Sequence, residues 1–249
     1  MFNTIYILWL RQVKRYMRSK ARLIGSLGQP VLFLVALGYG FGPMYARAGE
    51  GDYLQFLAPG IILMSILFTG MFNGIEIIWD KQFGFLKETL AAPVSRFSIV
   101  LGRTLGGASV ALMQGLIVMG IAMIVGFRPD SFILIIPAIL IMFLVALIFT
   151  ALGTAIASTL EDMHGFQLIM NFLIMPTFFL SGAIFPLEGL PGAISVITKI
   201  NPLSYGVDGL RQTLTGLGIH SYDLNLLILL FTLIIFLSIG SYLFSRIEV

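Results

Sequence analysis

The sequence predicts an all-α integral membrane protein, and two observations carry this prediction. First, 58% of the 249 residues are hydrophobic and 11% are charged, whereas a soluble domain is about 25% charged. Second, long apolar runs alternate with short polar segments, and lipid accepts apolar surface on every outer face of a helix. The length suits about six spans with short loops. We therefore expect one transmembrane domain over residues 1–249 and no sizeable soluble domain.

Residues 1–22 are expected to form an amphipathic helix in the membrane interface. At about 100° per residue, one helix face is basic and the opposite face is apolar. The basic face holds Arg11, Lys14, Arg15, Arg18 and Arg22, and the apolar face holds Phe2, Ile5, Tyr6, Trp9, Val13 and Tyr16. Such a helix lies with its apolar side toward lipid and its basic side toward anionic headgroups or a partner.

Six apolar runs follow as expected transmembrane helices. Their approximate ranges are 23–44, 56–79, 99–125, 132–158, 166–181 and 224–244. Pro30 predicts a kink or break in the first of them. The fifth is short for a full crossing, which takes about 20 residues. Glycines recur at a spacing of four at Gly38/Gly42, Gly70/Gly74 and Gly102/Gly106, which allows close helix contact, either within the chain or at a subunit interface.

Residues 80–96 form an unusual polar stretch between the second and third spans. We expect a helix up to Ala92, because Pro93 follows. Its charged residues are mixed with Phe83, Phe85, Leu86 and Leu90. A solvated loop is the plain alternative, but an exposed helix with large apolar side chains suits docking into a groove on a partner.

Residues 183–223 form the longest segment outside the spans. Apolar residues there are mixed with Gly and Pro. This pattern favours short re-entrant helices in the membrane interface over a solvated loop, because helical backbone satisfies its own hydrogen bonds.

The basic residues predict the orientation in the membrane. With six spans, 11 of the 15 Lys and Arg residues lie on the side of the termini and four on the other side. Basic residues concentrate on the cytoplasmic side. We therefore expect both termini and residues 80–96 in the cytoplasm and residues 183–223 outside. Basic residues beside spans also argue for membrane topology rather than nucleic-acid binding.

Aromatic and amide side chains interrupt the second and fifth spans. They are Phe68, Phe72 and Asn73, followed by Asn171, Phe178 and Phe179. Ordinary packing is one interpretation, and a path for an amphipathic substrate is the other. The ionisable residues near these spans are few: Glu76 and Arg103 lie near the cytoplasmic ends. Glu76 is read either as an interface carboxylate or as one half of a salt bridge to the polar helix that follows.

Several kinds of chemistry are not supported by the sequence. A phosphate-binding loop needs a Gly-Lys pair, which the chain lacks. Cysteine is absent, and His164 and His220 are far apart without metal-ligand spacing. We expect no metal site, no catalytic residue and no cofactor bound by this chain, so that any ATP must be bound by another chain.

Two segments resemble the permease subunits of type-two ABC exporters. The first is Phe83-Gly-Phe-Leu-Lys-Glu-Thr-Leu-Ala-Ala-Pro-Val-Ser-Arg96. The second is Phe179-Leu-Ser-Gly-Ala-Ile-Phe-Pro-Leu-Glu-Gly-Leu-Pro191 with Ile200-Asn-Pro-Leu-Ser-Tyr-Gly-Val-Asp-Gly-Leu-Arg211. The basic N-terminal helix and six spans are also similar, so the resemblance covers the whole chain. Daunorubicin-resistance-type drug exporters and polysaccharide export permeases are members of this family.

The resemblance implies a prokaryotic inner-membrane complex of two permeases, most simply a homodimer, with two cytoplasmic ABC ATPases that bind ATP and Mg. It implies export of a drug, lipid, glycolipid or polysaccharide. The ATPase-docking residues would be Arg11, Arg15, Arg18, Lys81, Phe85, Leu86, Lys87, Glu88 and Leu90, with a smaller contact at Glu161 and Asp162. The external cap would include Phe185, Pro186, Glu188 and Pro191.

Two other classes of function are weighed against this one. An ion-coupled carrier or channel without an ATPase partner would use ionisable residues within its spans, which are scarce here. A membrane-embedded enzyme would need an acidic cluster, histidines or an activated serine. Ser181 is available, but both histidines fall in loops.

Overall fold

The computed structural model describes residues 2–49, 51–91, 93–187 and 191–247, and every regular element in these ranges is a helix. In chain order they are α1 (Phe2–Arg18), α2 (Lys20–Gly25), α3 (Gly28–Arg47), α4 (Tyr53–Phe72), α5 (Ile75–Gln82), α6 (Phe85–Ala91), α7 (Arg96–Val125), η1 (Phe132–Leu134), α8 (Ile135–Thr159), α9 (Met163–Phe179), α10 (Gly192–Ile200), α11 (Pro202–Thr215) and α12 (Tyr222–Ser245). The all-α prediction is confirmed.

Five helical stretches in the described ranges are long and apolar enough to cross a membrane. They are Leu23–Arg47, Tyr53–Gln82, Arg96–Val125, Phe132–Thr159 and Tyr222–Ser245. The sixth apolar helix, α9, has 17 residues, which is short of the ~20 needed for a full crossing. The structure therefore contains the expected five long segments and one short one.

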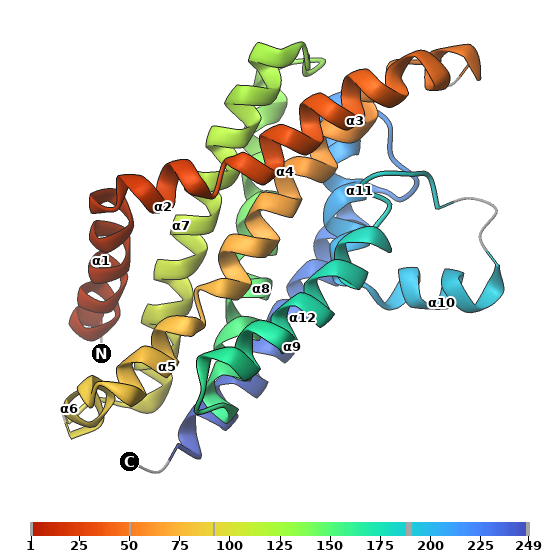
Figure 1. The fold of residues 1–249 in the computed structure, drawn as a ribbon. Coiled ribbons are helices and arrows are strands. Elements are labelled where there is room, and N and C mark those ends of the chain that lie inside the picture. The colour runs from red at the N-terminus through yellow and green to blue at the C-terminus, as the bar shows by residue number, and fades with distance from the viewer. Residues whose placement is uncertain (1, 50, 92, 188–190, 248–249) are drawn as a thin grey trace.

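Helices α4, α7 and α8 form the centre of the bundle (Figure 1). Helix α1 packs along α7, and α12 packs along α8. Helix α3 leans away from the others and contacts mainly α4. Much of the surface of α3 and α12 is exposed and apolar, as lipid-facing helices require.

Three predicted helices are broken in the structure. The first span divides at Ser26–Leu27, shortly before Pro30, as that proline predicts. The second span divides at Asn73–Gly74 into α4 and α5. The predicted helix over 80–92 is wrong as a single element: Gly84 has φ +79°, a left-handed conformation that ends α5 and lets α6 begin in a new direction.

The recurring glycines allow close packing within the chain. A Cβ atom at Gly74 would lie 2.3 Å from the carbonyl oxygen of Gly153 on α8. A Cβ at Gly106 of α7 would lie 2.6 Å from Oε1 of Gln12 on α1. Gly74 is therefore required, because a side chain there would collide with the backbone of α8, whereas a side chain at Gly106 would require the Gln12 side chain to move.

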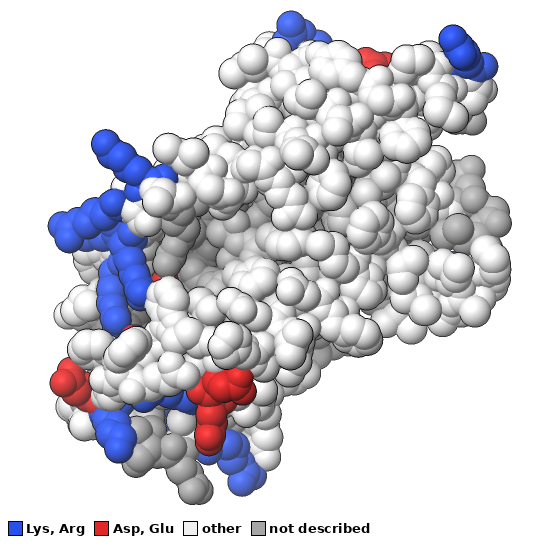
Figure 2. Space-filling model, viewed as in Figure 1, with Lys and Arg blue, Asp and Glu red and all other residues white. Residues whose placement is uncertain are grey.

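Both termini lie at the same end of the bundle, beside α5 and α6 (Figure 1). On the face drawn in Figure 2, most Lys and Arg side chains gather at that end, and a few lie at the opposite end. We call the end with the termini the basic end. Helices α10 and α11 and the connection between α3 and α4 lie away from it (Figure 1).

The segment expected to be re-entrant contains two different helices. Helix α11 is amphipathic and packs against α4, α8 and α12, with most of its residues buried. Helix α10 projects from the side of the bundle (Figure 1) and is largely exposed. Helix α10 is therefore exposed, whereas α11 is packed into the bundle, and their placement at the membrane interface stays a prediction.

Candidate functional site

Charged residues of three helices meet at the basic end of the bundle. Asp80, in the last turn of α5, accepts hydrogen bonds from Nη2 of Arg103 on α7 and, at 3.3 Å, from Nη2 of Arg11 on α1. One turn earlier, Oε1 of Glu76 lies 3.5 Å from Nη1 of Arg15. Glu76 and Asp80 are four residues apart and so project from the same side of α5. We call these five residues the charge cluster.

The charge cluster is partly buried, so its charged groups need their partners. Asp80 and Arg103 are both almost inaccessible, whereas Arg11 and Arg15 are partly exposed. A buried charge without a partner is strongly destabilising, so each member constrains the others. The cluster thus holds α1, α5 and α7 in one relative position.

Helix α1 also contacts α7 through hydrogen bonds on the face predicted to be apolar. Nε1 of Trp9 donates to Oγ of Ser109 at 2.9 Å, and the buried Tyr16 hydroxyl donates to Oε1 of Gln114. The prediction that this whole face lies toward lipid is therefore wrong for Trp9 and Tyr16. Their ring bodies are packed against α7 while Phe2 and Tyr6 stay exposed.

Helix α6 presents the exposed part of the expected docking segment. Phe83 is 70% and Phe85 is 52% exposed, and Lys87 and Glu88 are also exposed. Leu86 is 0% exposed. The structure does not support Leu86 as a residue of the docking surface, because its side chain is packed in the core below α6. Leu90 is partly buried against the same core.

The connection between α8 and α9 lies against the end of α5. Nζ of Lys81 donates to the carbonyl oxygens of Ser158, at 2.8 Å, and Leu160, at 3.0 Å. Nε2 of Gln82 donates to the carbonyl oxygen of Glu161 at 3.1 Å. A lysine on the last carbonyls of a helix satisfies acceptors that have no intrahelical donor. Two predicted docking regions therefore form one continuous surface.

Individual docking residues have different surroundings in this region. Glu161 and Asp162 are exposed. Asp162 caps α9, because its Oδ1 accepts from the backbone N–H of Gly165 at 2.6 Å. Arg18 is exposed at the end of α1. Lys81, by contrast, is engaged within the chain, so its contribution to docking would be indirect.

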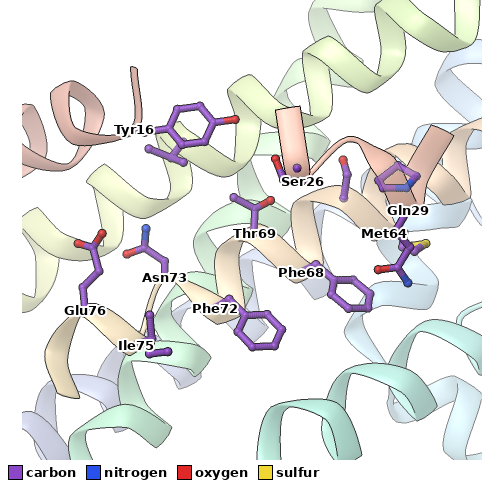
Figure 3. Close-up of a pocket in the computed structure, with 14 residues that line it drawn as sticks. Tyr16, Ser26, Gln29, Met64, Phe68, Thr69, Phe72, Asn73, Ile75 and Glu76 are labelled. Carbon is purple, nitrogen blue, oxygen red and sulfur yellow. The ribbon is translucent and has the colours of Figure 1, made fainter. Parts of the chain in front are cut away.

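A cavity of about 330 Å³ lies between the α1–α3 segment and α4 (Figure 3). The rings of Phe68 and Phe72 project from α4, with centroids 6.4 Å apart and nearly parallel planes. Polar side chains border the same space: Gln29 and Ser26 near the break before α3, and Thr69, Asn73, Glu76 and Tyr16 elsewhere on its wall. This size and mixture suit a small amphipathic molecule.

The expected path residues fall into two groups in the structure. Phe68, Phe72 and Asn73 line the cavity. Asn171 and Phe179 of α9 are exposed and Phe178 is buried. The three α9 residues are not among those lining the cavity, so the structure does not bring the two groups together.

A second polar network lies around α11. Arg211 donates from Nε and Nη2 to the carbonyl oxygen of Phe56 at 3.1 and 3.0 Å, and from Nη2 to that of Gly182 at 2.9 Å. Its guanidinium carbon lies 3.8 Å from the centroid of the Phe56 ring. Burial lowers the pKa of Arg211 to about 10, while the nearby Asp208 opposes that shift. The side chain therefore remains a cation at neutral pH.

Asp208 and Asn201 complete this network. The Asp208 carboxylate accepts from the backbone N–H groups of Ile219 and His220, at 2.7 and 2.9 Å, and from Nδ2 of Asn225 at 2.9 Å. Asn201 caps α11 through Leu203 and donates to the carbonyl oxygen of Thr177 at 2.7 Å. These contacts fasten α11 to the ends of α9 and α12.

The described residues of the expected external cap lie just before α10 in the chain. Phe185, Pro186 and Pro191 are exposed, and Pro191 immediately precedes the first turn of α10. Glu188 lies outside the described residues.

Several key residues were missed by reasoning from the sequence. Asp80 was treated as part of a polar stretch, and Arg103 as an interface residue, although the structure pairs them. Arg211 was counted as an outer loop cation, although it is buried. A charged residue inside an otherwise apolar helix was the available signal for Arg103. Glu76 does form a salt bridge, but with α1 rather than with the helix that follows.

The fold and these contacts define a multi-helix membrane protein with a structured basic end and an amphipathic cavity beside α4. Residues 3–215 match the ABC-2 type transporter family, and the chain belongs to that family.

Several named proteins are similar to this chain over most of their length, in agreement with this membership. The chain is 32% identical over 219 residues to the transport permease ycf38 of Pyropia yezoensis, covering 85% of this chain and 74% of that protein. It is 27% identical over 221 residues to Nodulation protein J of Rhizobium leguminosarum bv. viciae, covering 88% and 85%. It is 26% identical over 216 residues to the inner membrane transport permease YadH of Escherichia coli K12, covering 84% and 82%.

Proposed function

We propose that this chain is the transmembrane half of an ATP-driven exporter that moves an amphipathic substrate out of the cytoplasm. Two copies of the chain would assemble with two cytoplasmic ABC ATPase subunits, which bind ATP and Mg. The membrane would be a prokaryotic inner membrane with both termini cytoplasmic. Membership of the ABC-2 family supports an ABC ATPase partner, and the charge distribution supports the orientation.

The observation that carries this proposal is the surface of α6. Phe83, just after α5, and Phe85, at the start of α6, are large apolar side chains exposed at the basic end, near the charged Lys87 and Glu88. Exposed aromatic anchors within a charged rim are typical of a protein docking surface. The adjoining loop at Glu161 and Asp162 extends that surface.

A docked ATPase would move the spans through α5. Helix α6 follows α5 directly after Gly84, and α5 is joined to α1 and α7 by the charge cluster. Lys81 joins the same helix to the end of α8. A displacement of α6 would therefore be passed to three helices that surround the cavity or support its walls.

The cavity supplies a place for the substrate before export. Its paired aromatic rings favour a flat or apolar body, and its amide and hydroxyl groups can accept or donate hydrogen bonds. Helix α10 with Phe185, Pro186 and Pro191 would cap the outer exit. An ion-coupled carrier is the alternative, but Glu76, Asp80 and Arg103 are engaged with one another or with α1, at one end of the bundle.

The decisive experiment uses Phe85→Asp in the chain co-expressed with its ATPase. Leu217→Asp is the matched control, because Leu217 is also an exposed apolar residue but lies after α11, away from the basic end. Phe85→Asp should lower co-purification of the ATPase and vanadate-sensitive ATP hydrolysis at least tenfold, since docking anchors contribute about 2 kcal/mol or more. Wild-type association and hydrolysis retained in Phe85→Asp would contradict the docking assignment. The absence of any ATPase in the wild-type preparation would contradict the exporter as a whole.

A further inference from the structure

A second cavity, of about 230 Å³, lies between α10, α11 and the segment before α12. It is distinct from the amphipathic cavity described above, which lies between the α1–α3 segment and α4. Most of the described residues that line it have polar side chains: two cations, one carboxylate, one imidazole and several hydroxyl groups. The cations are Lys199 and Arg211, and the hydroxyl groups belong to Ser181, Ser195, Thr198, Ser204 and Tyr205.

The two cations differ in burial and in the N–H donors that remain without a hydrogen bond to a described residue. Arg211 is almost fully buried, and its contacts with described residues use Nε and Nη2. No hydrogen bond from its Nη1 to a described residue is present, and Nη1 carries two further N–H donors. Lys199 lies on the exposed side of the cavity, and its ammonium forms no hydrogen bond with the described residues. The cavity therefore combines a buried cation held by hydrogen bonds with an exposed one.

Asp208, the one carboxylate among the described lining residues, already has hydrogen-bond partners. Asp208 accepts from the backbone N–H groups of Ile219 and His220, from the Asn225 amide and from the His220 ring at 3.2 Å. With one acid against two permanent cations, the described residues of the lining carry net positive charge. Cationic groups accompanied by hydroxyl donors are the combination that recognises a phosphate group.

The neighbouring surface of α10 favours a lipid as the source of that phosphate. Val196, Ile197 and Ile200 are each more than half exposed on this short helix. Lys199 lies between Ile197 and Ile200 in the sequence. An amphipathic helix of this kind lies in the interface between headgroups and acyl chains. A volume of 230 Å³ is below the 300–1,000 Å³ of pockets that enclose drug-sized ligands, so it suits a headgroup whose chains stay outside.

We propose that this cavity binds the phosphate headgroup of a membrane phospholipid, with Arg211 and Lys199 as the cationic ligands and the acyl chains along the apolar face of α10. Bound lipid would fix α10 against α11. The site lies apart from α6 and does not depend on an ATPase.

Native mass spectrometry of the purified chain tests this proposal with dihexanoyl phosphatidylglycerol as the probe. The informative variant is Lys199→Gln, because Lys199 is exposed and its loss leaves the Arg211 network intact. Arg47→Gln is the matched control: Arg47 is an exposed cation at the end of α3, away from the basic end and outside the cavity. Lys199→Gln should weaken lipid binding roughly tenfold, as expected for one charge-assisted hydrogen bond, while Arg47→Gln binds like wild type.

Two further arms identify the source of the phosphate. Dihexanoylglycerol, which lacks the phosphate, should not bind, and millimolar inorganic phosphate should not displace the phospholipid. Displacement by inorganic phosphate alone would assign the cavity to a free anion and overturn the lipid assignment. Equal weakening in Lys199→Gln and Arg47→Gln, or in neither, would overturn the site itself. Arg211→Lys, which keeps the charge but loses the planar donors, should bind less tightly than wild type if it is still folded by thermal melting.

Discussion

Asp80 and Arg103 form a salt bridge in which both side chains are almost completely buried, although they lie on different helices. Asp80→Asn should therefore lower the free energy of unfolding by about 3–5 kcal/mol, because Arg103 would stay buried without a countercharge. Unfolding in increasing sodium dodecyl sulfate, followed by circular dichroism, measures this change. Asp223→Asn serves as the control, since Asp223 is an exposed acid in the first turn of α12.

The control should lose at most about 1 kcal/mol, the contribution of an acid near a helix N-terminus. The double variant Asp80→Asn with Arg103→Gln should be more stable than Asp80→Asn alone, because it removes the unpaired charge. A double variant less stable than the single one would contradict the view that the unpaired arginine is the source of the loss.

The contact between Gly74 and Gly153 gives a second prediction. A Cβ atom at Gly153 would lie 2.3 Å from the carbonyl oxygen of Met71, a backbone atom that cannot rotate away. Gly153→Ala should therefore cost about 1–3 kcal/mol through overpacking. Gly120→Ala is the matched control, because Gly120 also lies within a span helix but has nothing within 4 Å of its would-be Cβ.

The control change should be neutral or stabilising by up to about 1 kcal/mol, since alanine favours helix more than glycine does. Thermal melting of both variants in the same detergent makes the comparison. Equal melting temperatures for the two variants would show that the close approach of the end of α4 to α8 is not required.

The helices could be predicted from the sequence because each depends on neighbouring residues. Apolar runs marked the spans, and the shortness of the run at α9 was visible before the structure. The basic face of α1 could also be read from residues that lie three and four positions apart. Pro30 marked the break before α3 because proline lacks the donor that a continuing helix needs.

Contacts between distant residues could not be predicted in the same way. Asp80 and Arg11 are 69 positions apart, and nothing in their local patterns specifies that they meet. The left-handed backbone at Gly84 turned one predicted helix into two and placed Leu86 in the core. Arg211 was counted only among the basic residues of the outer side, and its burial could not be predicted because it depends on carbonyl groups that distant segments supply.

Lys81 gives a third prediction, about the loop between α8 and α9. Its ammonium donates to the carbonyl oxygens of Ser158 and Leu160. Lys81→Met should free the end of α8 and speed hydrogen exchange of the amides in residues 157–163, because the loop loses its anchor. Lys87→Met is the control, as Lys87 is exposed and its ammonium makes no hydrogen bond or ion pair with described residues. Faster exchange in both variants, or in neither, would contradict the anchoring role.

The paired rings of the amphipathic cavity give the last prediction. Phe68 and Phe72 lie 6.4 Å apart between centroids and border the same space as Asn73 (Figure 3). Phe72→Ala should weaken the binding of rhodamine 6G, an amphipathic dye, and raise its dissociation constant about tenfold. Loss of one stacking partner and its apolar contact costs about 1.4 kcal/mol, which corresponds to that factor. Fluorescence anisotropy of the dye with the purified permease measures the affinity.

Phe231→Ala is the matched control for that measurement, because Phe231 is an exposed ring on α12, outside the cavity. It should leave dye affinity unchanged, since its removal alters only a surface that faces lipid. Asn73→Leu separates the two parts of the site: it removes an amide but keeps apolar volume, so a dye held mainly by its rings should keep most of its affinity. Equal losses in Phe72→Ala and Phe231→Ala would mean that the dye partitions into the lipid-facing surface, and the cavity would then not be the substrate site.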